Sequence, residues 1–348
     1  MDSPSVCVIV LNWNNWQDTL ECLDSLVRVN YPLFQIIVVD NGSEDDSFDR
    51  IRRFCMGIGA VRGYMEVQKS ESKPITLIDS PDEHLRECKP KVHEGASPTN
   101  GDSEKIVLIR SNTNLGYSGG NNLGIDFALR LFKPDYVLLL NNDTVVDSRF
   151  LGELVSASES NSRIGFAGPK ILYYSFHGRK DVINFAGGKI NLWIGGAKHI
   201  LANQPDNKTG ESVTEVDYVE GSCLLARVEM LNKIGLLDPS FFLFWEETDW
   251  CVRGRKAGYK CVCVQASRIW HKVGATVTSR DSFFYNTRNM FWFMRRYATN
   301  LQLISFSLYL AVFAFWFNAA VTLGVHKRKD EFMAYCRGIR DGVLRPKS

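Results

Sequence analysis

The chain has 348 residues, of which 45% are hydrophobic and 23% are charged. This composition is sufficient for a sizeable core and excludes a chain that is disordered throughout. Its 41 Lys and Arg residues almost balance 39 Asp and Glu residues, so no basic excess points to nucleic acid as the main partner. Nine cysteines without a CxxC pair predict reduced thiols rather than a zinc ribbon or a disulfide scaffold.

The first fifty residues alternate between buried strands and amphipathic helices. Val6–Leu11 and Phe34–Val39 are continuous apolar runs, typical of strands that are covered on both faces. Between them, apolar residues recur every three or four positions from Trp16 until Pro32 predicts a stop. A capping box at Ser43 and Asp46 predicts the next helix. This strand-helix order predicts a parallel sheet with right-handed crossovers.

A polar stretch then interrupts the pattern. Residues 57–105 are rich in Lys, Glu, Ser and Pro, so we expect a surface insertion with one short hairpin (Tyr64–Val67 and Ile75–Ile78). The pattern resumes with predicted strands at 106–109, 136–140 and 164–167, and with predicted helices at 123–132, 149–158 and 227–234. The sequence therefore predicts an α/β, Rossmann-like fold with a mostly parallel central sheet and flanking helices.

Four polar clusters follow predicted strands. They are Asn12-Trp13-Asn14, Asp40-Asn41-Gly42-Ser43, the glycine- and asparagine-rich loop 112–122, and Asn141-Asn142-Asp143. Any one of them has an ordinary structural interpretation, because Asp caps helices and Asn favours turns. Together they indicate a ligand pocket, since open α/β sheets bind ligands beyond the carboxyl ends of their strands.

Asp143 and His271 are candidate metal ligands. Asp143 follows a buried strand, and its carboxylate suits Mg²⁺ or Mn²⁺, which share their oxygen ligands with substrate phosphates. His271 follows a second apolar stretch and is expected to complete the metal shell. The alternative for His271 is a hydrogen-bonded core histidine, which is the commoner case for a lone histidine.

Three carboxylates, Glu246, Glu247 and Asp249, stand beside large aromatic residues. Crowding among aromatic rings raises the pKa of at least one of them, and a raised pKa suits a general base. The alternative is helix N-terminal acidity favoured by the helix dipole. The spacing leaves both interpretations open.

Several of these stretches occur together in one known family. They are 8–14, Val38–Ser43, Asn114–Gly124, Leu139–Thr144, Gly221–Cys223, Gly235–Phe242 and Glu246–Asp249, followed by Arg253 and Gly258-Tyr259. In this order the chain resembles the GT-A-fold, family 2 inverting glycosyltransferases, especially the rhamnosyltransferase-like branch. The resemblance covers about residues 5–295 and implies a catalytic domain at 1–280.

The resemblance implies roles for the candidate residues. Asp40 would hold the base or ribose of a nucleotide-sugar, with four neighbours (Asn12, Asn114, Gly119 and Asn122). Asn141-Asn142-Asp143 occupies the place of the metal-binding DxD-like motif, so Asp143 and Asn141 would hold Mg²⁺ or Mn²⁺ with His271, and Asn142 would face the donor. The carboxylates Glu247, Glu246 and Asp249 would form the catalytic group, with Glu247 as the base.

Two positions depart from the family pattern. Asn141 stands where Asp is usual and is a weaker metal ligand, and Glu247 stands where Asp is common, so Glu246 and Glu247 could exchange roles. The implied reaction moves a sugar from a dTDP-, UDP- or GDP-linked donor to a glycan or lipid-linked acceptor in cell-surface polysaccharide or glycoconjugate synthesis. Two alternatives are a sugar nucleotidyltransferase and a non-catalytic, membrane-associated glycan-binding relative.

The stretch Leu301–Val325 contains no charged residue. As a helix it would be roughly 37 Å long, enough to cross a hydrocarbon core of about 30 Å. A single span with the catalytic half at the cytoplasmic face would place the basic tail outside, against the positive-inside tendency. We therefore expect 281–348 to be a helical, membrane-associated region with an in-plane or re-entrant helix. The alternative is a buried core helix or a dimer contact.

Overall fold

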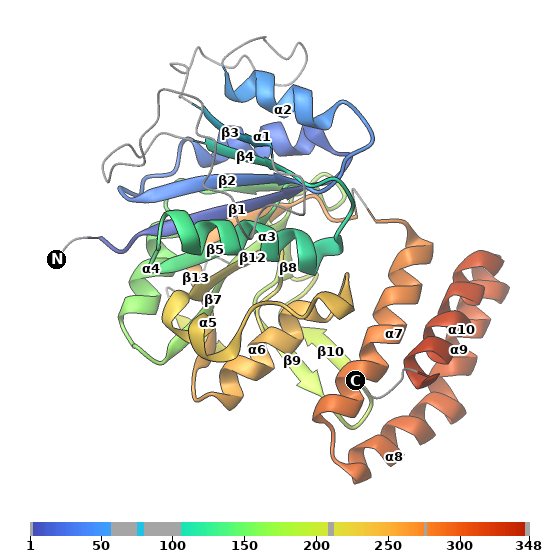
Figure 1. Cartoon of the computed structure of the whole chain (residues 1–348). Helices are drawn as coiled ribbons and strands as arrows, with labels where there is room; N and C mark the ends of the chain where they lie inside the picture. The colour runs from blue at the N-terminus through green and yellow to red at the C-terminus, as the bar shows by residue number, and fades with distance from the viewer. Residues whose placement is uncertain (1–2, 57–74, 80–105, 208–211, 275–276, 345–348) are drawn as a thin grey trace.

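The computed structural model describes residues 3–56, 75–79, 106–207, 212–274 and 277–344 (Figure 1). An α/β unit carries one large sheet, and a layer of helices formed by the end of the chain lies beside it. The sheet order is β11-β13-β7-β12-β5-β1-β2-β4-β3, with β6 and β8 attached to β13 and β7.

One half of the sheet is entirely parallel. Its strands are β3 (Ile75–Asp79), β4 (Ile106–Arg110), β2 (Phe34–Asp40), β1 (Val6–Asn12) and β5 (Tyr136–Asn141). The buried runs expected from the sequence form β1, β2 and β5. The register pairs Asn12 with Asp40 and Leu11 with Asn141, so the polar clusters that follow these strands meet at one edge.

The other half of the sheet is mixed. Strand β12 (Cys223–Arg227) runs antiparallel to both neighbours, β5 and β7 (Ile164–Tyr173), while β13 (Lys260–His271) runs parallel to β7. Among the described residues, seven of the eleven strands of this sheet therefore share one direction, which confirms the mostly parallel sheet. The remaining short strands are β6 (Thr144–Val146), β8 (Ile183–Phe185), β11 (Val213–Val216) and the separate hairpin β9 (Gly188–Asn191) and β10 (Gly196–His199).

Helices cover the sheet. They are α1 (Trp16–Leu26), α2 (Ser47–Cys55), α3 (Gly116–Leu131), α4 (Phe150–Glu159), α5 (Val228–Ile234) and α6 (Glu246–Lys256), with a short 3₁₀ turn, η1 (Pro239–Phe241). Apolar residues from both faces of the sheet form one continuous core. This core fixes the strand ends, and hence the candidate site residues, on a rigid frame.

Three sequence-based expectations about local structure were wrong. Ile75–Asp79 forms an edge strand parallel to β4 and not half of a hairpin; its proposed partner, 64–67, lies outside the described residues. The N-cap of α2 is Asp46, and Ser43 instead donates its hydroxyl proton to Asp40.

The third error concerns α3, which begins at Gly116 and not at Leu123, so most of the glycine-rich segment is helix. The reason is close packing: a Cβ at Gly120 would lie 2.5 Å from Leu11 Cδ1, and one at Gly124 would lie 2.6 Å from Ile9 Cγ2. The glycines therefore let α3 approach β1 and are not signs of a loop.

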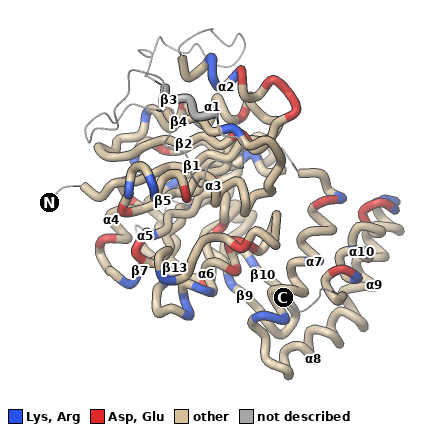
Figure 2. The backbone as a smooth tube through the Cα atoms, viewed as in Figure 1, with Lys and Arg blue, Asp and Glu red and all other residues tan. Residues whose placement is uncertain are grey.

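The chain ends in a layer of helices. α7 (Ser279–Tyr297) starts just before the predicted boundary at 280 and packs against α10 (Lys329–Leu344). Between them one helix runs over Asn300–Val325, with α8 (Asn300–Tyr309) and α9 (Phe315–Ala319) alternating with π-helical turns η2 (Leu310–Ala314) and η3 (Ala320–Val325). This helix is long and apolar enough to cross a membrane, and only 6% of its most apolar window is buried. Figure 2 shows no charged residue along α8, whereas both signs occur over the α/β unit.

Candidate active site

Asp40 lies at the centre of a buried polar network at the ends of β1 and β2. Its Oδ1 accepts hydrogen bonds from Asn12 Nδ2 (2.8 Å) and Ser43 Oγ (2.6 Å). Asn12 in turn accepts at Oδ1 from Thr19 Oγ1 (2.8 Å), and Asn142 Nδ2 donates to Thr19 Oγ1 (2.9 Å). Burial raises the pKa of the Asp40 carboxyl, while Ser43 and Asn12 oppose that rise. Three of the expected donor-site residues thus share one network.

The loop before α3 is held against this network. Asn114 Oδ1 accepts from Asn41 Nδ2 (3.1 Å) and from the backbone N–H of Gly116 (2.8 Å). Gly119 lies in the first turns of α3. The Asn122 amide differs from expectation, because it donates to and accepts from the backbone of Leu237 (2.8 and 3.1 Å). Its contacts are those of a residue that positions the 237–245 segment, and we assign it that role.

Asp143 and His271 are brought together by β13. His271 ends β13, opposite Thr144 of β6, and its Nε2 lies 3.1 Å from Asp143 Oδ1. Burial would lower the pKa of His271, but Asp143 and then Glu220 outweigh it, so this pKa is raised. Asn141 ends β5, and its backbone carbonyl accepts the Thr144 hydroxyl (2.7 Å).

The ligand atoms that Asp143 and His271 offer decide which cation can bind between them. Within the described residues no group of three or more His, Cys, Asp and Glu side chains could hold a metal by itself. Asp143 and His271 offer one oxygen and one nitrogen ligand, and Nδ1 of His271 is buried without a hydrogen-bond partner among the residues that the structure describes. Such a pair fits a cation that takes its other ligands from a substrate diphosphate and water.

The segment before α6 has a strained backbone. Phe242, Phe244 and Trp245 have φ of 64°, 67° and 74°, a region that large L-residues rarely adopt. Asn289 of α7 holds this turn, because its Nδ2 donates to three backbone carbonyls, those of Phe241, Leu243 and Phe244 (2.7–2.8 Å). Strain of this kind concentrates at functional sites, and here it delivers Glu246 and Glu247 at the first turn of α6.

The two glutamates are buried and differ in their surroundings. Burial, with a further contribution from Glu220, raises the pKa of Glu247 to about 7. Burial and then Glu247 raise the pKa of Glu246 well above its ordinary value. Oε2 of Glu246 is buried and has no hydrogen-bond partner in the described part of the chain. Because Glu247 lines a cavity and has a pKa near neutrality, it is the better candidate base.

Glu220 is a site residue that the sequence did not reveal. It lines the same cavity as Glu247, and its Oε1 lies 3.9 Å from His271 Nδ1. Its other oxygen, Oε2, is buried and accepts no hydrogen bond from any described residue. Glu220 belongs to none of the motifs that the sequence singles out, so its position carried no signal. Glu220 connects the two expected centres, since it faces Glu247 on one side and the Asp143–His271 pair on the other.

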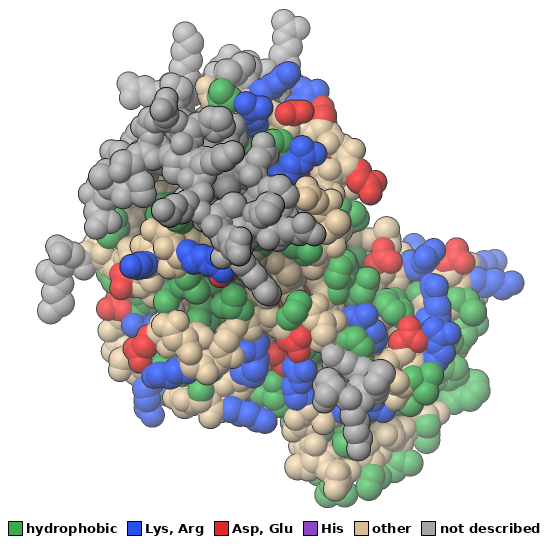
Figure 3. Space-filling view, in the orientation of Figure 1, with side chains coloured by type: hydrophobic (Ala, Val, Ile, Leu, Met, Phe, Trp, Pro, Cys, Tyr) green, Lys and Arg blue, Asp and Glu red, His purple; other side chains and the backbone are tan. Residues whose placement is uncertain are grey.

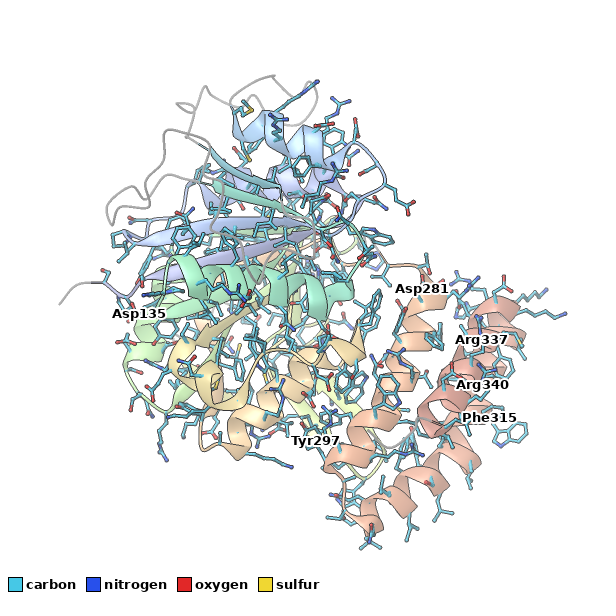
Figure 4. All side chains as sticks on the ribbon, in the orientation of Figure 1. Asp135, Asp281, Tyr297, Phe315, Arg337 and Arg340 are labelled. Atoms are coloured by element: carbon cyan, nitrogen blue, oxygen red, sulfur yellow. The ribbon has the colours of Figure 1, made fainter. Side chains whose placement is uncertain are left out.

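Asp249 is placed differently from the other two acids of its motif. It is fully buried, and it accepts from Arg253 Nε (2.9 Å), from an Arg296 guanidinium nitrogen (2.6 Å) and from the Tyr297 hydroxyl (2.7 Å). Figure 4 labels Tyr297 near the end of α7. The expectation that Asp249 belongs with the catalytic carboxylates is not supported by these contacts, which engage both its oxygens. We assign it to the anchoring of α6 on α7.

A cavity of about 590 Å³ opens beside Glu247. One wall belongs to the α/β unit and contains Glu220, Tyr218 and the β9–β10 hairpin; the other belongs to the C-terminal helices, including Met290, Phe306 and Tyr335. Asp143 and Asp40 do not line it. The cavity therefore contacts Glu247 and Glu220 but not the Asp40 network.

Comparison with known proteins identifies the family. A model described as "Glycosyltransferase like family 2" matches residues 92–294, and a second, "Glycosyl transferase family 2", matches residues 6–65. The first match alone covers more than half of the chain. The chain belongs to the family 2 glycosyltransferases, which confirms the resemblance drawn from the motifs and disfavours the nucleotidyltransferase alternative.

Two curated proteins are similar in sequence. The low-salt glycan biosynthesis hexosyltransferase Agl10 of Haloferax volcanii is 28% identical over 225 residues, which is 64% of this chain and 61% of that protein. The dTDP-rhamnosyl transferase RfbF of Shigella flexneri is 21% identical over 242 residues, which is 67% of this chain and 76% of that protein. The match thus spans less than two thirds of the Haloferax protein's length.

Solved structures share the fold. The mannosyltransferase PcManGT from Pyrobaculum calidifontis, in complex with GDP-Man and Mn²⁺, has a TM-score of 0.54 at 12% identity, covering 100% of this chain and 77% of that one. GalNAc-T7, with UDP, GalNAc and Mn²⁺, has a TM-score of 0.53 at 12% identity, covering 91% of this chain and 58% of that one. These likenesses confirm the GT-A fold.

Proposed function

We propose that the protein is a metal-dependent inverting glycosyltransferase that moves a sugar from a nucleotide-sugar to a hydroxyl of a glycan or lipid-linked glycan. One observation carries the proposal: a buried glutamate, Glu247, whose pKa is raised to about 7, lines a cavity next to Glu220, which itself approaches the Asp143–His271 pair. A base that lines a cavity, with a second carboxylate between it and a metal-ligand pair, suits transfer between two substrates.

The nucleotide-sugar would lie over the Asp40 network. Asp40 and Asn12 would bind the base or ribose, with Asn114 and Gly119 beside them and Asn142 fixing the strand end. The named relatives and structural neighbours use dTDP-rhamnose, GDP-mannose and UDP, so all three nucleotides are candidate donors.

Asp143 and His271 would hold a divalent cation, with Asn141 as a weaker neighbouring ligand. Mg²⁺ and Mn²⁺ are both candidates, because each accepts carboxylate oxygen and takes further ligands from substrate phosphates and water. When bound, the cation would offset the charge on the departing diphosphate. The presence of Mn²⁺ in both solved neighbours supports this assignment.

The chemistry follows from these positions. Glu247 removes the proton of the acceptor hydroxyl, whose oxygen attacks the anomeric carbon on the face opposite the diphosphate. The new C–O bond forms as the bond to the diphosphate oxygen breaks, so one displacement inverts the configuration. Glu246, whose pKa burial and Glu247 raise well above its ordinary value, is the second acid beside this base. We place the reaction at the cytoplasmic face of a membrane, where nucleotide-sugars are supplied, within cell-surface polysaccharide or glycoconjugate synthesis.

The test is donor turnover by the full chain with Mn²⁺ and a panel of dTDP-, UDP- and GDP-sugars, with water as acceptor. We expect Glu247→Gln to lower hydrolysis by roughly 100-fold or more, with donor affinity unchanged by calorimetry. Glu229→Gln, at an exposed acid of α5, is the matched control. Full activity of Glu247→Gln would exclude Glu247 as the base, and a wild-type protein that binds donors without turning any over would favour the non-catalytic alternative.

A further inference from the structure

His271 stands between two carboxylates at the end of β13. Its Nε2 lies 3.1 Å from Asp143 Oδ1, and its Nδ1 lies 3.9 Å from Glu220 Oε1. His271 is only 7% exposed, and Nδ1 has no hydrogen-bond partner among the residues that the structure describes. The two nitrogens of an imidazole ring point in different directions. A cation held by Nε2 and Asp143 would therefore leave Glu220 outside its ligand shell.

A cation at Nε2 decides where the remaining proton of His271 must be. A metal-bound imidazole is neutral and keeps one proton, which is then on Nδ1. A buried N–H group without an acceptor is unfavourable, so the Nδ1–H of a metal-bound His271 needs an acceptor. Glu220 Oε1 is the carboxylate oxygen that lies on this side of the ring.

Glu220 lacks the cationic neighbours that many acidic side chains have on the surface. Figure 3 shows acidic and basic side chains close together over the α/β unit, and Glu229, for example, pairs with Lys233 at 2.9 Å. Within the described residues, the ion pairs of Glu220 include His271 alone, and its Oε2 is buried without a hydrogen-bond partner. A carboxylate in such a setting is stabilised by a proton donor that is directed at it.

The backbone around Glu220 is fixed to both halves of the site. The Tyr117 hydroxyl of α3 donates to the Gly221 carbonyl (2.5 Å), and the N–H of Asn141 donates to the Ser222 carbonyl (3.0 Å). The side chain of Glu220 is 20% exposed and lines the cavity, which leaves it room to turn toward the ring. Hydrogen bonds at active sites are often long in a protein without its ligands and shorten when the ligands bind.

From these observations we infer that Glu220 is a positioning residue for the cation: it accepts the Nδ1 proton of His271 and so keeps Nε2 unprotonated and directed at the metal beside Asp143. The inference rests on the proposed function and deepens it, because it assigns Glu220 neither to the metal shell nor to the base but to the orientation of a metal ligand. A carboxylate behind a histidine ligand fixes the ring and strengthens its bond to the cation.

The first experiment measures the Mn²⁺ affinity of the full chain by titration calorimetry, with UDP, GDP and dTDP in turn. Glu220→Met keeps the length of the side chain and removes the acceptor, and we expect it to weaken Mn²⁺ binding by roughly 10- to 100-fold. Glu220→Gln keeps a carbonyl that accepts from Nδ1–H, so its loss should be clearly smaller. Glu229→Met, at an exposed acid of α5, is the matched control and should bind Mn²⁺ as the wild type does. Unchanged affinity in Glu220→Met, or equal losses in Glu220→Met and Glu220→Gln, would overturn the inference.

Two further measurements separate this role from a general loss of folding. Without metal, Glu220→Met should unfold at a temperature no lower than the wild type, since it removes a buried oxygen that has no partner. Nuclear magnetic resonance with ¹⁵N-labelled histidine reads the proton itself, in a chain with 6 histidines. With Mg²⁺ and nucleotide, the Nδ1–H of His271, assigned with His271→Gln, should be protected from exchange in the wild type and in Glu220→Gln. Equal protection in Glu220→Met would refute Glu220 as the acceptor.

Donor hydrolysis at increasing Mn²⁺ concentration separates Glu220 from the base. At a pH above the pKa of Glu247, turnover by Glu220→Met should return toward the wild-type rate as Mn²⁺ is raised, whereas Glu247→Gln should stay slow. Turnover by Glu220→Met that stays low at saturating Mn²⁺ would make Glu220 part of the chemistry and overturn the inference. If the wild type and Glu220→Met bind Mn²⁺ equally and both hydrolyse a donor, the inference fails and the proposed function stands. If the wild type neither binds Mn²⁺ nor hydrolyses any donor, the proposed function itself fails.

Discussion

Nε2 of His271 lies 3.1 Å from Oδ1 of Asp143, although the two residues lie far apart in the sequence. The contact exists because β13 pairs with β6, the short strand that begins directly after Asp143. A cation bound here would replace the proton between the two side chains. Metal affinity and proton affinity therefore compete at this pair.

The first prediction concerns this pair. Asp143→Asn and His271→Gln should each weaken Mn²⁺ binding in the presence of nucleotide by roughly 10- to 100-fold, and chelation by EDTA should stop donor hydrolysis by the wild type. Titration calorimetry with Mn²⁺ gives the affinities. His177→Gln, at an exposed histidine, is the control. Unchanged Mn²⁺ affinity in both variants would move the cation to another site.

The second prediction concerns pH. A base acts when deprotonated, and the pKa of Glu247 is raised to about 7, so donor hydrolysis should rise with pH up to about 7 and then level off. Glu220 contributes to that raised pKa, so Glu220→Gln should move the rising limb to lower pH. A pH–rate profile for each protein checks this. A limb that stays in place in Glu220→Gln would show that Glu220 does not act on Glu247.

The same pKa makes a prediction about stability. The pKa of Glu247 in the folded protein, about 7, exceeds its ordinary value of 4.5, so the folded state binds this proton more tightly than the unfolded state. The contribution of Glu247 to the free energy of unfolding is therefore fully present below about pH 4.5 and is lost as the pH rises through about 7. Glu247→Gln should flatten the fall in the free energy of unfolding over that window, measured by urea denaturation at several pH values. An equally steep fall in the variant would contradict the assignment.

The third prediction concerns Asp249. Its removal leaves Arg296 and Arg253 without their buried partner, so Asp249→Ala should lower the free energy of unfolding by about 3 to 5 kcal/mol. Lys233→Ala, which breaks an exposed pair with Glu229, should lower the free energy of unfolding far less. Chemical denaturation compares the two. A small loss in Asp249→Ala together with a large loss of turnover would restore the catalytic role expected from its spacing.

The fourth prediction concerns Asn289, which holds the strained turn before α6. Asn289→Ala leaves three carbonyls without this donor and should cost about 2 to 3 kcal/mol in the free energy of unfolding. Turnover should fall as well, because Glu247 follows this turn directly. Asn30→Ala, at an exposed asparagine, is the control for both measurements. Normal turnover in folded Asn289→Ala would show that Glu247 is positioned without it.

Much of the fold is predictable from local pattern. Continuous apolar runs predict β1, β2 and β5, since strands buried on both faces need apolar residues at every position. The start of α3 is not predictable in this way, because glycine has low helix propensity and its reason, the approach to Leu11 and Ile9, lies on another element. The edge strand β3 is similar, since its pairing with β4 is a long-range contact.

For the candidate site, the sequence by itself determined the residue types and the strand ends that carry them, because motif spacing and strand burial are local properties. Only the tertiary structure decided that Glu220 joins Glu247 and His271, that both oxygens of Asp249 are taken by arginines and a tyrosine, and that the 300–325 helix forms a cavity wall. The physical reason is that burial, nearby charges and shared cavities depend on which distant segments pack together. The local pattern of a single sequence does not indicate that packing.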